Sequence, residues 1–290
     1  MLATSMWTSY LIELLPDDMV KTYAKYGWQT SELSDEHAHD ILKRGKPAAA
    51  GKDFRRFAAD LGMSFPQGHF LLATKGIRPE DMEGRSIADI APEDDSAFAA
   101  MMDTMKNWVE LFAAIGIKAG VLHCGGQAML AKGRDMNQVF QRRCQAVATV
   151  ADFAAGSGLN ICLENLFMDG TRQCSELLAI INEIKRPNVG ICLDTGHANA
   201  RQVDVPAFIR EAGSHLQALH IADNLGQNDD HMLPFGRGTV PWLKVMPALR
   251  EVGYSGLFNF EVPGENRCPM PIRLAKFSYA KALADHMLQL

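Results

Sequence analysis

The stretch 188-NVGICLDTGH-197 decides the fold that the sequence predicts. It begins as an apolar run and ends abruptly in polar residues, with Asp194 at the break and His197 three residues later. The apolar run predicts a buried strand. Two interpretations of its end compete. In one, Asp194 caps the next helix and His197 is a structural histidine; in the other, the strand presents metal ligands at its tip.

The same pattern recurs along the chain, because short β-rich segments alternate with amphipathic ones. We expect strands at 3–9, 28–34, 65–71, 118–124, 159–165, 188–194, 216–222 and 256–262. Between them, as in 97–116, apolar residues recur at the three- and four-residue spacing of a helix. Many of these segments end in a glycine just before the next strand, which is typical of a helix C-cap. Alternating strands and helices predict a parallel sheet with right-handed crossovers.

The length of the chain favours a closed sheet. With 290 residues and no linker or break in composition, the chain has the usual size of one α/β barrel. We therefore predict the α/β class and a single (β/α)8 TIM-barrel domain over 1–290, with an open doubly wound sheet as the alternative. The connection at about 72–96, after the third strand, is unusually long and predicts a lid or side wall over the site.

Composition excludes several classes of protein. Hydrophobic residues make up 47% and charged residues 22% of the chain, as in ordinary globular proteins, and the net charge is −5. This balance favours neither nucleic acid nor an acidic membrane surface. The six cysteines form no C-x-x-C pair and are expected to be reduced thiols. With no membrane-spanning run and no basic leader, we expect a cytoplasmic protein.

Polar residues mark the ends of the predicted strands. In a barrel the chemistry lies at the carboxyl ends of the strands, so polar residues should gather there and nowhere else in the strands. Residues of this kind close the strands or lie in the loops that follow: His69, His123, Glu164, Asp194, His197, His220, Asp229, His231 and Glu261. Gathering several carboxylates is costly unless a cation or protons neutralise them.

Four of these residues offer a set of metal ligands from four consecutive strands. Glu164, Asp194 and Glu261 supply oxygen, and His220 supplies nitrogen. This mixture suits Mn²⁺, Mg²⁺ or Co²⁺, and Zn²⁺ is also compatible with it. The sequence therefore predicts a divalent-metal site at the mouth of the barrel.

The motifs, in their order and spacing, resemble those of the xylose-isomerase-like barrel superfamily over nearly the whole chain. They are 164-ENL-166, 194-DTGH-197, His220, 231-HMLPFGRG-238 and Glu261. That superfamily includes sugar-phosphate isomerases and epimerases, ketose 3-epimerases, inosose dehydratase and the endonuclease IV type of apurinic-site nuclease. The resemblance implies one divalent metal ion, with Mn²⁺ as the first choice, on the four ligands named above.

The resemblance also implies the chemistry. The expected substrate is a small ketose, keto-inositol or keto-glycoside, and the reaction is proton transfer beside its carbonyl. Glu164 and Glu261 are the predicted acid/base pair, and His197 is expected to hydrogen-bond the developing oxyanion. The residues predicted to bind the substrate are His69, His123, His231 and Arg237. Ketose 3-epimerases carry an arginine soon after the histidine of strand seven; 221-IADNLGQ-227 has none, so Arg237 or Arg267 is the candidate replacement.

Three other functions stay open. A dehydratase or lyase would use the same residues to expel a β-hydroxyl group. An endonuclease IV-like phosphodiesterase would hold three zinc ions on all nine strand-end residues, although acidic loops such as 222-ADNLGQNDD-230 disfavour contacts with phosphates. A non-catalytic sugar-binding barrel would have no need of an acid/base pair. We expect a sugar-like small molecule as partner, no nucleic acid and no membrane, and leave a homo-oligomer open.

Three further residues have two interpretations each. Glu32, at the end of the second strand, either binds substrate hydroxyl groups or ties down a neighbouring strand. Trp7 and Phe70 either form an apolar floor of the pocket or pack in the core.

Overall fold

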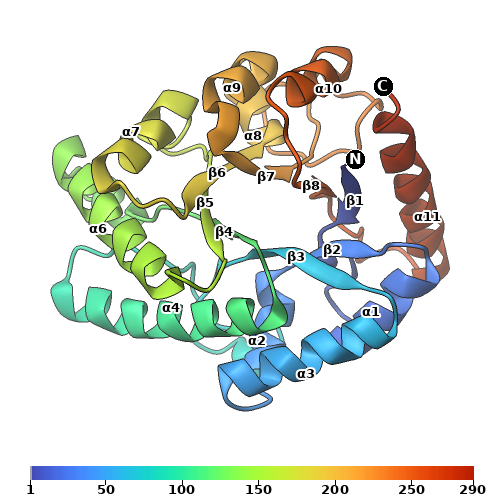
Figure 1. Cartoon of the computed structure of the whole chain (residues 1–290), viewed down its shortest axis with the longest axis horizontal. Helices are drawn as coiled ribbons and strands as arrows, with labels where there is room; N and C mark the ends of the chain where they lie inside the picture. The colour runs from blue at the N-terminus through green and yellow to red at the C-terminus, as the bar shows by residue number, and fades with distance from the viewer. Residues whose placement is uncertain (1) are drawn as a thin grey trace.

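Eight parallel strands alternate with helices in the computed structural model, which describes residues 2–290 (Figure 1). The strands are β1 (Ala3–Met6), β2 (Thr30–Leu33), β3 (Ser64–His69), β4 (Ala119–Leu122), β5 (Asn160–Glu164), β6 (Val189–Asp194), β7 (Leu216–His220) and β8 (Leu257–Phe260). Each overlaps one of the eight predicted ranges, so the strand pattern of the sequence is confirmed.

Helices surround the strands on the outside of the molecule (Figure 1). They are α1 (Pro16–Lys25), α2 (Asp35–Leu42), α3 (Pro47–Asp60), α4 (Asp95–Ile115), α5 (Gln127–Ala131), α6 (Met136–Ala154), α7 (Cys174–Ile184), α8 (Thr195–Ala200), α9 (Val205–Ala212), α10 (Trp242–Glu251) and α11 (Met270–Met287). Local signals set their ends. In α4, Asp94 caps the first turn by accepting from the backbone N–H of Ala97, and Gly116 ends the helix at a φ of 92°.

The strands form two parallel sheets that meet at two seams. Strands β2 to β7 pair in chain order, and β1 pairs with β8. A parallel bridge between Trp7 and Glu32 joins β1 to β2, and another between Ile221 and Phe260 joins β7 to β8. The strand order thus returns to its start, which is the arrangement of a TIM barrel.

Strand alternation explains why the polar strand ends face inward. Leu163, Leu193 and Leu219 belong to the large apolar core. Their neighbours Cys162, Cys192 and Ala218 form a separate small cluster with Ala119 and Val121. Side chains two residues apart lie on the same face of a strand. The next residues on the face of the small cluster are therefore Glu164, Asp194 and His220.

The expectation that the strands carry polar residues only at their ends was wrong. Gln67 and Asn259 are buried within β3 and β8, and Ser5 is buried in β1. The hydroxyl of Ser5 donates to Oδ1 of Asn259 at 2.6 Å, and Nδ2 of Asn259 donates to Glu32 at 2.7 Å. Because Ser5, Asn259 and the amide nitrogen of Gln67 find partners inside the barrel, most of the usual cost of burying them is offset.

The long connection 72–96 is fixed at several points. It contains a 3₁₀ turn, η2 (Pro79–Asp81), and an antiparallel bridge between Ala73 and Ile87. Arg78 donates to the carboxylate of Asp40 on α2 and to the carbonyl of Leu14. The segment is therefore held against the first part of the chain.

Within residues 2–290, no helix combines the length and the apolar character that crossing a bilayer requires.

Candidate metal centre

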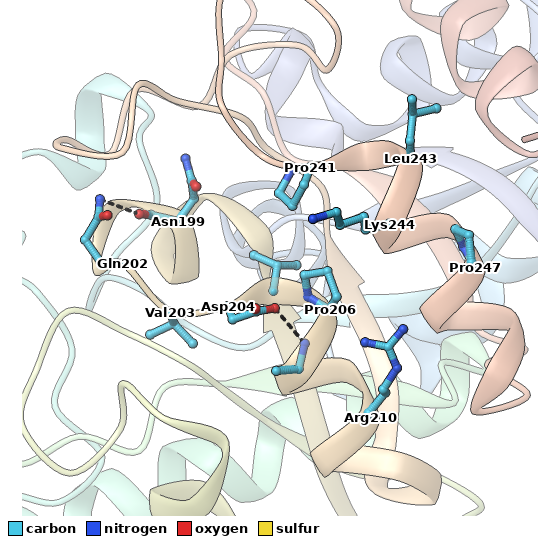
Figure 2. Close-up of a pocket in the computed structure, with 12 residues that line it drawn as sticks. Asn199, Gln202, Val203, Asp204, Pro206, Arg210, Pro241, Leu243, Lys244 and Pro247 are labelled. Carbon is cyan, nitrogen blue, oxygen red and sulfur yellow. Dashed lines mark hydrogen bonds between the residues drawn. The ribbon is translucent and has the colours of Figure 1, made fainter.

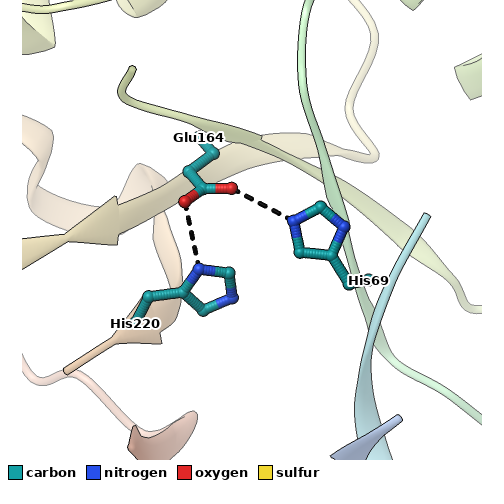
Figure 3. A group of neighbouring side chains, drawn as sticks. All are labelled: His69, Glu164 and His220. Atoms are coloured by element: carbon teal, nitrogen blue, oxygen red, sulfur yellow. Dashed lines mark hydrogen bonds and ion pairs between the residues drawn. The ribbon is translucent and has the colours of Figure 1, made fainter. Parts of the chain in front are cut away.

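Four side chains from four consecutive strands converge at one end of the barrel. They are Glu164 at the end of β5, Asp194 at the end of β6, His220 at the end of β7, and Glu261 just after β8. One ligand atom from each lies within 4.8 Å of the ligand atoms of the others, and all four residues are buried. Nδ1 of His220 lies 3.1 Å from Oε1 of Glu164, a contact visible in Figure 3, and 3.0 Å from Oε2 of Glu261.

The donor set fits a divalent cation. Oδ2 of Asp194 and Oε2 of Glu261 are buried without a hydrogen-bond partner. The 3.0 Å approach of His220 to Glu261 therefore lacks hydrogen-bond geometry, although the two atoms are close. Buried carboxylate oxygens without partners are costly, and a cation among them would remove that cost. Three carboxylates and one imidazole are also the ligands expected for Mn²⁺ or a similar ion.

The position of Asp194 is compatible with both interpretations of the opening stretch. Its Oδ1 accepts the backbone N–H of His197 at 2.5 Å and caps helix α8, while Oδ2 stays free for the cluster. Asn165 fixes the same strand end, because its side chain accepts from the N–H of Asp194 at 2.7 Å and donates to its carbonyl at 3.0 Å. Asn165 in the 164-ENL-166 motif is thus a structural clamp between β5 and β6.

Two predicted substrate-binding histidines hold the second oxygen of Glu164. Nε2 of His69 lies 3.2 Å from Oε2 of Glu164, and Nε2 of His123 lies 3.0 Å from the same atom. Figure 3 draws the contact between His69 and Glu164. The ring of His69 is fixed from behind, because its Nδ1 donates to the carbonyl of Phe70 at 2.7 Å. Glu164 is therefore shared between the candidate metal ligands and this pair of imidazoles.

A second group adjoins the four ligands. Asp229 places one oxygen 3.3 Å from Nε2 of His197 and the other 2.9 Å from Nε2 of His231. Both rings point their Nδ1 atoms at backbone carbonyls, that of His197 at Asn165 and that of His231 at Glu261, at 2.9 and 2.7 Å. This group links the loop after β7 to helix α8 and to the end of β8.

The charges of the centre follow from burial and from these contacts. Burial raises the pKa of Asp194 to about 7. Burial also opposes ionisation of Glu164, but the nearby His220 and His123 outweigh it and hold the pKa of Glu164 well below its ordinary value. The carboxylates beside His197 and His231 overcome the effect of burial and raise the pKa of these rings to about 10 and about 11. Ionised carboxylates in the centre are therefore paired with protonated imidazoles, as His197 and His231 are with their neighbouring carboxylates.

The centre opens into a cavity of about 410 Å³. The predicted site residues that line it are His69, His123, Glu164, His197, His231 and Glu261. Trp7, Leu72, Asp229, Asp230 and Pro263 complete the lining. Leu72 comes from the start of the long 72–96 connection, so that segment forms part of the wall. Trp7 lines the cavity, and its Nε1 is buried without a hydrogen-bond partner.

Some predicted residues lie elsewhere. Arg237 and Arg267 are exposed, and neither lines the cavity. Phe70 is buried and stacks on Phe112 with 4.6 Å between ring centroids, so it belongs to the core. Glu32 is fully buried and does not line the cavity. It contacts Gln67 on β3 and Asn259 on β8, which agrees with the interpretation that it ties strands together.

Another groove lies outside the barrel. It runs between α8, α9 and the start of α10, and Figure 2 shows the 12 residues that line it. These include Arg210 and Lys244, but none of the predicted catalytic or metal-binding residues. The chemistry is therefore assigned to the centre at the strand ends.

Comparison with known proteins identifies the family. A model described as xylose isomerase-like TIM barrel matches residues 20–288, and the chain belongs to this family, as its motifs predicted. The D-psicose 3-epimerase of Agrobacterium fabrum is 25% identical over 245 residues, which are 83% of this chain and 77% of that protein. The ketose 3-epimerase of Arthrobacter globiformis is 28% identical over 196 residues, which are 66% of this chain and 65% of that protein.

Solved structures agree on the fold. A crystal structure of a D-psicose 3-epimerase in the presence of D-fructose has a TM-score of 0.79 at 19% identity, with 99% of both chains covered. The 3-keto-D-glucoside 4-epimerase from E. coli has a TM-score of 0.75 at 13% identity, with 97% of this chain and 100% of that chain covered. At such identities the likeness concerns the fold alone.

Proposed function

We propose that this protein is a divalent-metal-dependent isomerase or epimerase of a small keto-sugar, keto-inositol or keto-glycoside. The single observation that carries the proposal is the convergence of Glu164, Asp194, His220 and Glu261, buried together with two unpartnered carboxylate oxygens. The comparisons support the class of enzyme, since the relatives named above are 3-epimerases of ketoses.

The roles of the chain's residues follow from their positions. A divalent ion on the four ligands would polarise the carbonyl of the substrate and its neighbouring hydroxyl group. Glu164 and Glu261 both line the cavity, so one removes the proton beside the carbonyl and the other returns it. His197 donates to the oxygen on which negative charge develops.

The remaining cavity residues position the substrate. His69 and His123 hold Oε2 of Glu164, and His123 also reaches the cavity with 28% of its side chain exposed. Asp229, His197 and His231 form the second group, which adjoins the four candidate ligands. Arg237 remains a prediction as a substrate-binding residue; it is exposed and lies outside the cavity lining.

Further parts of the proposal rest on the sequence. We propose Mn²⁺ as the native ion and a single domain over residues 1–290. We also propose that the 72–96 connection forms a side wall of the substrate pocket, because Leu72 lines the cavity. The expected partner is a small sugar-like molecule, without nucleic acid or membrane. A cytoplasmic location and a homo-oligomer stay predictions.

One experiment tests the proposal directly. Purified protein is analysed for bound metal and incubated in heavy water with a panel of ketoses, keto-inositols and keto-glycosides. We expect about one divalent ion per chain and deuterium uptake at the carbon beside the carbonyl of at least one compound. Uptake by none of the panel, or uptake that survives complete metal removal, contradicts the proposal. Loss of a hydroxyl group from the substrate would instead identify the dehydratase alternative.

A second candidate function, cleavage at apurinic sites, is favoured by one observation. All nine residues considered for a three-zinc centre lie together: His69 and His123 on Glu164, and His197 and His231 on Asp229, around the four metal ligands. The net charge of −5 and the acidic pair Asp229 and Asp230 in the cavity wall oppose binding of a phosphate backbone. Three zinc ions per chain with cleavage of abasic-site DNA would establish this alternative.

A further inference from the structure

Nε2 of His220, a candidate metal ligand, contacts the carboxylate of Glu32, which has no role in the proposed reaction. Nε2 of His220 lies 3.1 Å from Oε1 and 3.0 Å from Oε2 of Glu32. Both side chains are fully buried. Glu32 does not line the cavity, so its carboxylate acts on the centre through His220 rather than on a substrate.

The other partners of Glu32 show that its oxygens accept hydrogen bonds. Nδ2 of Asn259 donates to Oε2 at 2.7 Å, and the amide nitrogen of Gln67 donates to the same oxygen. The orientation of the Gln67 amide is fixed independently, because its nitrogen also donates to the carbonyl of Leu219 at 3.2 Å. Since Glu32 is surrounded by donors, Nε2 of His220 completes the set as a third donor.

This arrangement decides which nitrogen of His220 is available to an ion. With the proton on Nε2, the lone pair of a neutral ring lies on Nδ1. Nδ1 is the atom that faces Oε1 of Glu164 and Oε2 of Glu261, at 3.1 and 3.0 Å. The ligand atom of the imidazole therefore already points at the other ligands of the centre.

We infer that Glu32 is a positioning residue of the metal centre: its carboxylate holds the proton of His220 on Nε2 and turns Nδ1 toward the ion. A carboxylate behind a ligating histidine fixes the orientation of the ring and increases its basicity. Asn259 and Gln67 keep Glu32 in place, and Ser5 supports Asn259. The inference rests on the metal dependence of the proposed function.

The test compares Mn²⁺ affinity between variants of the whole protein. Metal-free wild type and Glu32→Gln are titrated with Mn²⁺ by calorimetry. Glutamine keeps the size of the side chain and removes its charge, so we expect Mn²⁺ to bind about 10- to 100-fold more weakly. Ser31→Ala is the matched control, because it removes a buried hydrogen bond from the same strand β2, to the carbonyl of Met6, and leaves the partners of Glu32 in place. Its Mn²⁺ affinity should stay within about twofold of wild type, since effects of this kind require contact with the ligand or its partner.

Two further measurements separate positioning from a purely structural role. If Glu32 only ties the strands together, Glu32→Gln lowers the melting temperature of the metal-free protein and leaves the Mn²⁺ affinity unchanged, which overturns the inference. In ¹⁵N-labelled wild type loaded with diamagnetic Zn²⁺, we expect the proton of His220 on Nε2 and the ion on Nδ1. An ion on Nε2 overturns the inference even if Glu32→Gln does not fold.

The outcomes also separate this inference from the proposed function. If wild type binds no divalent ion, both fail. If it binds Mn²⁺ and Glu32→Gln binds it equally well, the inference alone fails. A weakened affinity in Glu32→Gln, together with no reaction on any sugar of the panel, supports the inference and rejects the proposed chemistry.

Discussion

The carboxylate of Asp229 lies 3.3 Å from Nε2 of His197, and this contact connects the loop after β7 to helix α8. The other oxygen of Asp229 lies 2.9 Å from Nε2 of His231. One carboxylate thus holds two imidazoles at the cavity wall, and neither the strand pattern nor helical spacing links these residues in the sequence.

Replacing Asp229 is expected to weaken substrate binding. In Asp229→Asn the neutral amide stabilises neither positive ring well, so we expect KM to rise through His231 and kcat to fall through His197. Together they should lower kcat/KM about tenfold, the value of one charge-assisted hydrogen bond. Steady-state kinetics on the substrate identified from the panel measures both constants. Asp230→Asn is the control, because Asp230 lines the same cavity and makes no ion pair with either ring. Equal kcat/KM values in the two variants would contradict the role of Asp229.

Removing either carboxylic acid of the proposed acid/base pair should abolish turnover. We expect Glu164→Gln and Glu261→Gln to lose at least about 100-fold in kcat, because general acid or base catalysis contributes that much or more. Circular dichroism should show a folded barrel in both. Glu265→Gln changes an exposed residue of the same loop and should keep its activity. Less than tenfold loss in both Glu164→Gln and Glu261→Gln would exclude the pair from this role.

Metal removal should lower thermal stability. Oδ2 of Asp194 and Oε2 of Glu261 are buried without a hydrogen-bond partner, so binding of Mn²⁺ should stabilise the native state. At a concentration of 100 times Kd the expected gain is about 2.7 kcal/mol, a rise of several degrees in Tm. Differential scanning calorimetry with and without Mn²⁺ measures it. Asp194→Asn should show a smaller rise, and an equal rise in this variant would argue against Asp194 as a ligand.

Asp35 predicts a pH dependence of stability. Burial, followed by the neighbouring Glu36, raises the pKa of Asp35 from 3.8 to about 8. The folded state therefore favours the protonated carboxyl, so this contribution to stability is complete below pH 4, falls as the pH rises, and is lost once the pH passes about 8. The slope is at most about 1.4 kcal/mol per pH unit.

Urea unfolding at a series of pH values tests this prediction. Asp35→Asn carries no titratable group at this position, so its free energy of unfolding should fall less than that of wild type between pH 5 and pH 8. The backbone N–H of Leu72 donates to Asp35 at 3.1 Å, and an amide oxygen can accept the same bond. Parallel curves for the two proteins would refute the shift.

The 72–96 connection should loosen when its anchor is removed. Arg78→Ala loses the contacts with Asp40 and Leu14, so we expect faster proteolysis within the connection and a KM raised several-fold. Arg85→Ala is the control, because Arg85 bonds only to carbonyls of Lys75 and Gly76 inside the same segment. An unchanged proteolytic pattern in Arg78→Ala would show that the connection is held by other contacts.

The strand ends could be predicted from the sequence because they obey local rules. An apolar run that stops at a carboxylate or an imidazole is visible in one segment, and the barrel brings such ends together. The sequence alone therefore predicts one set that contains Glu164, Asp194, His220 and Glu261. The caps of the helices, such as Asp94 and Gly116, are equally local signals.

Contacts that depend on closure of the ring could not be predicted. Glu32 and His220 are separated by 188 positions and meet only because β2 and β7 face each other across the barrel interior. A mid-strand polar residue such as Asn259 looks unfavourable in the sequence, until a partner from another strand satisfies it. For Arg237 the residue type suggested a contact with substrate, but only the path of its loop could show that it is exposed.

The pairing of β1 with β8 has a consequence for biosynthesis. During translation, β1 leaves the ribosome first and β8 last, and Glu261 follows β8 directly. A nascent chain therefore holds at most three of the four candidate metal-binding side chains until β8 and Glu261 have been made, and its β1 and β7 edges stay open to pairing with other chains. Capture of the ion would then follow closure of the strand ring and end the period in which these edges are an aggregation hazard.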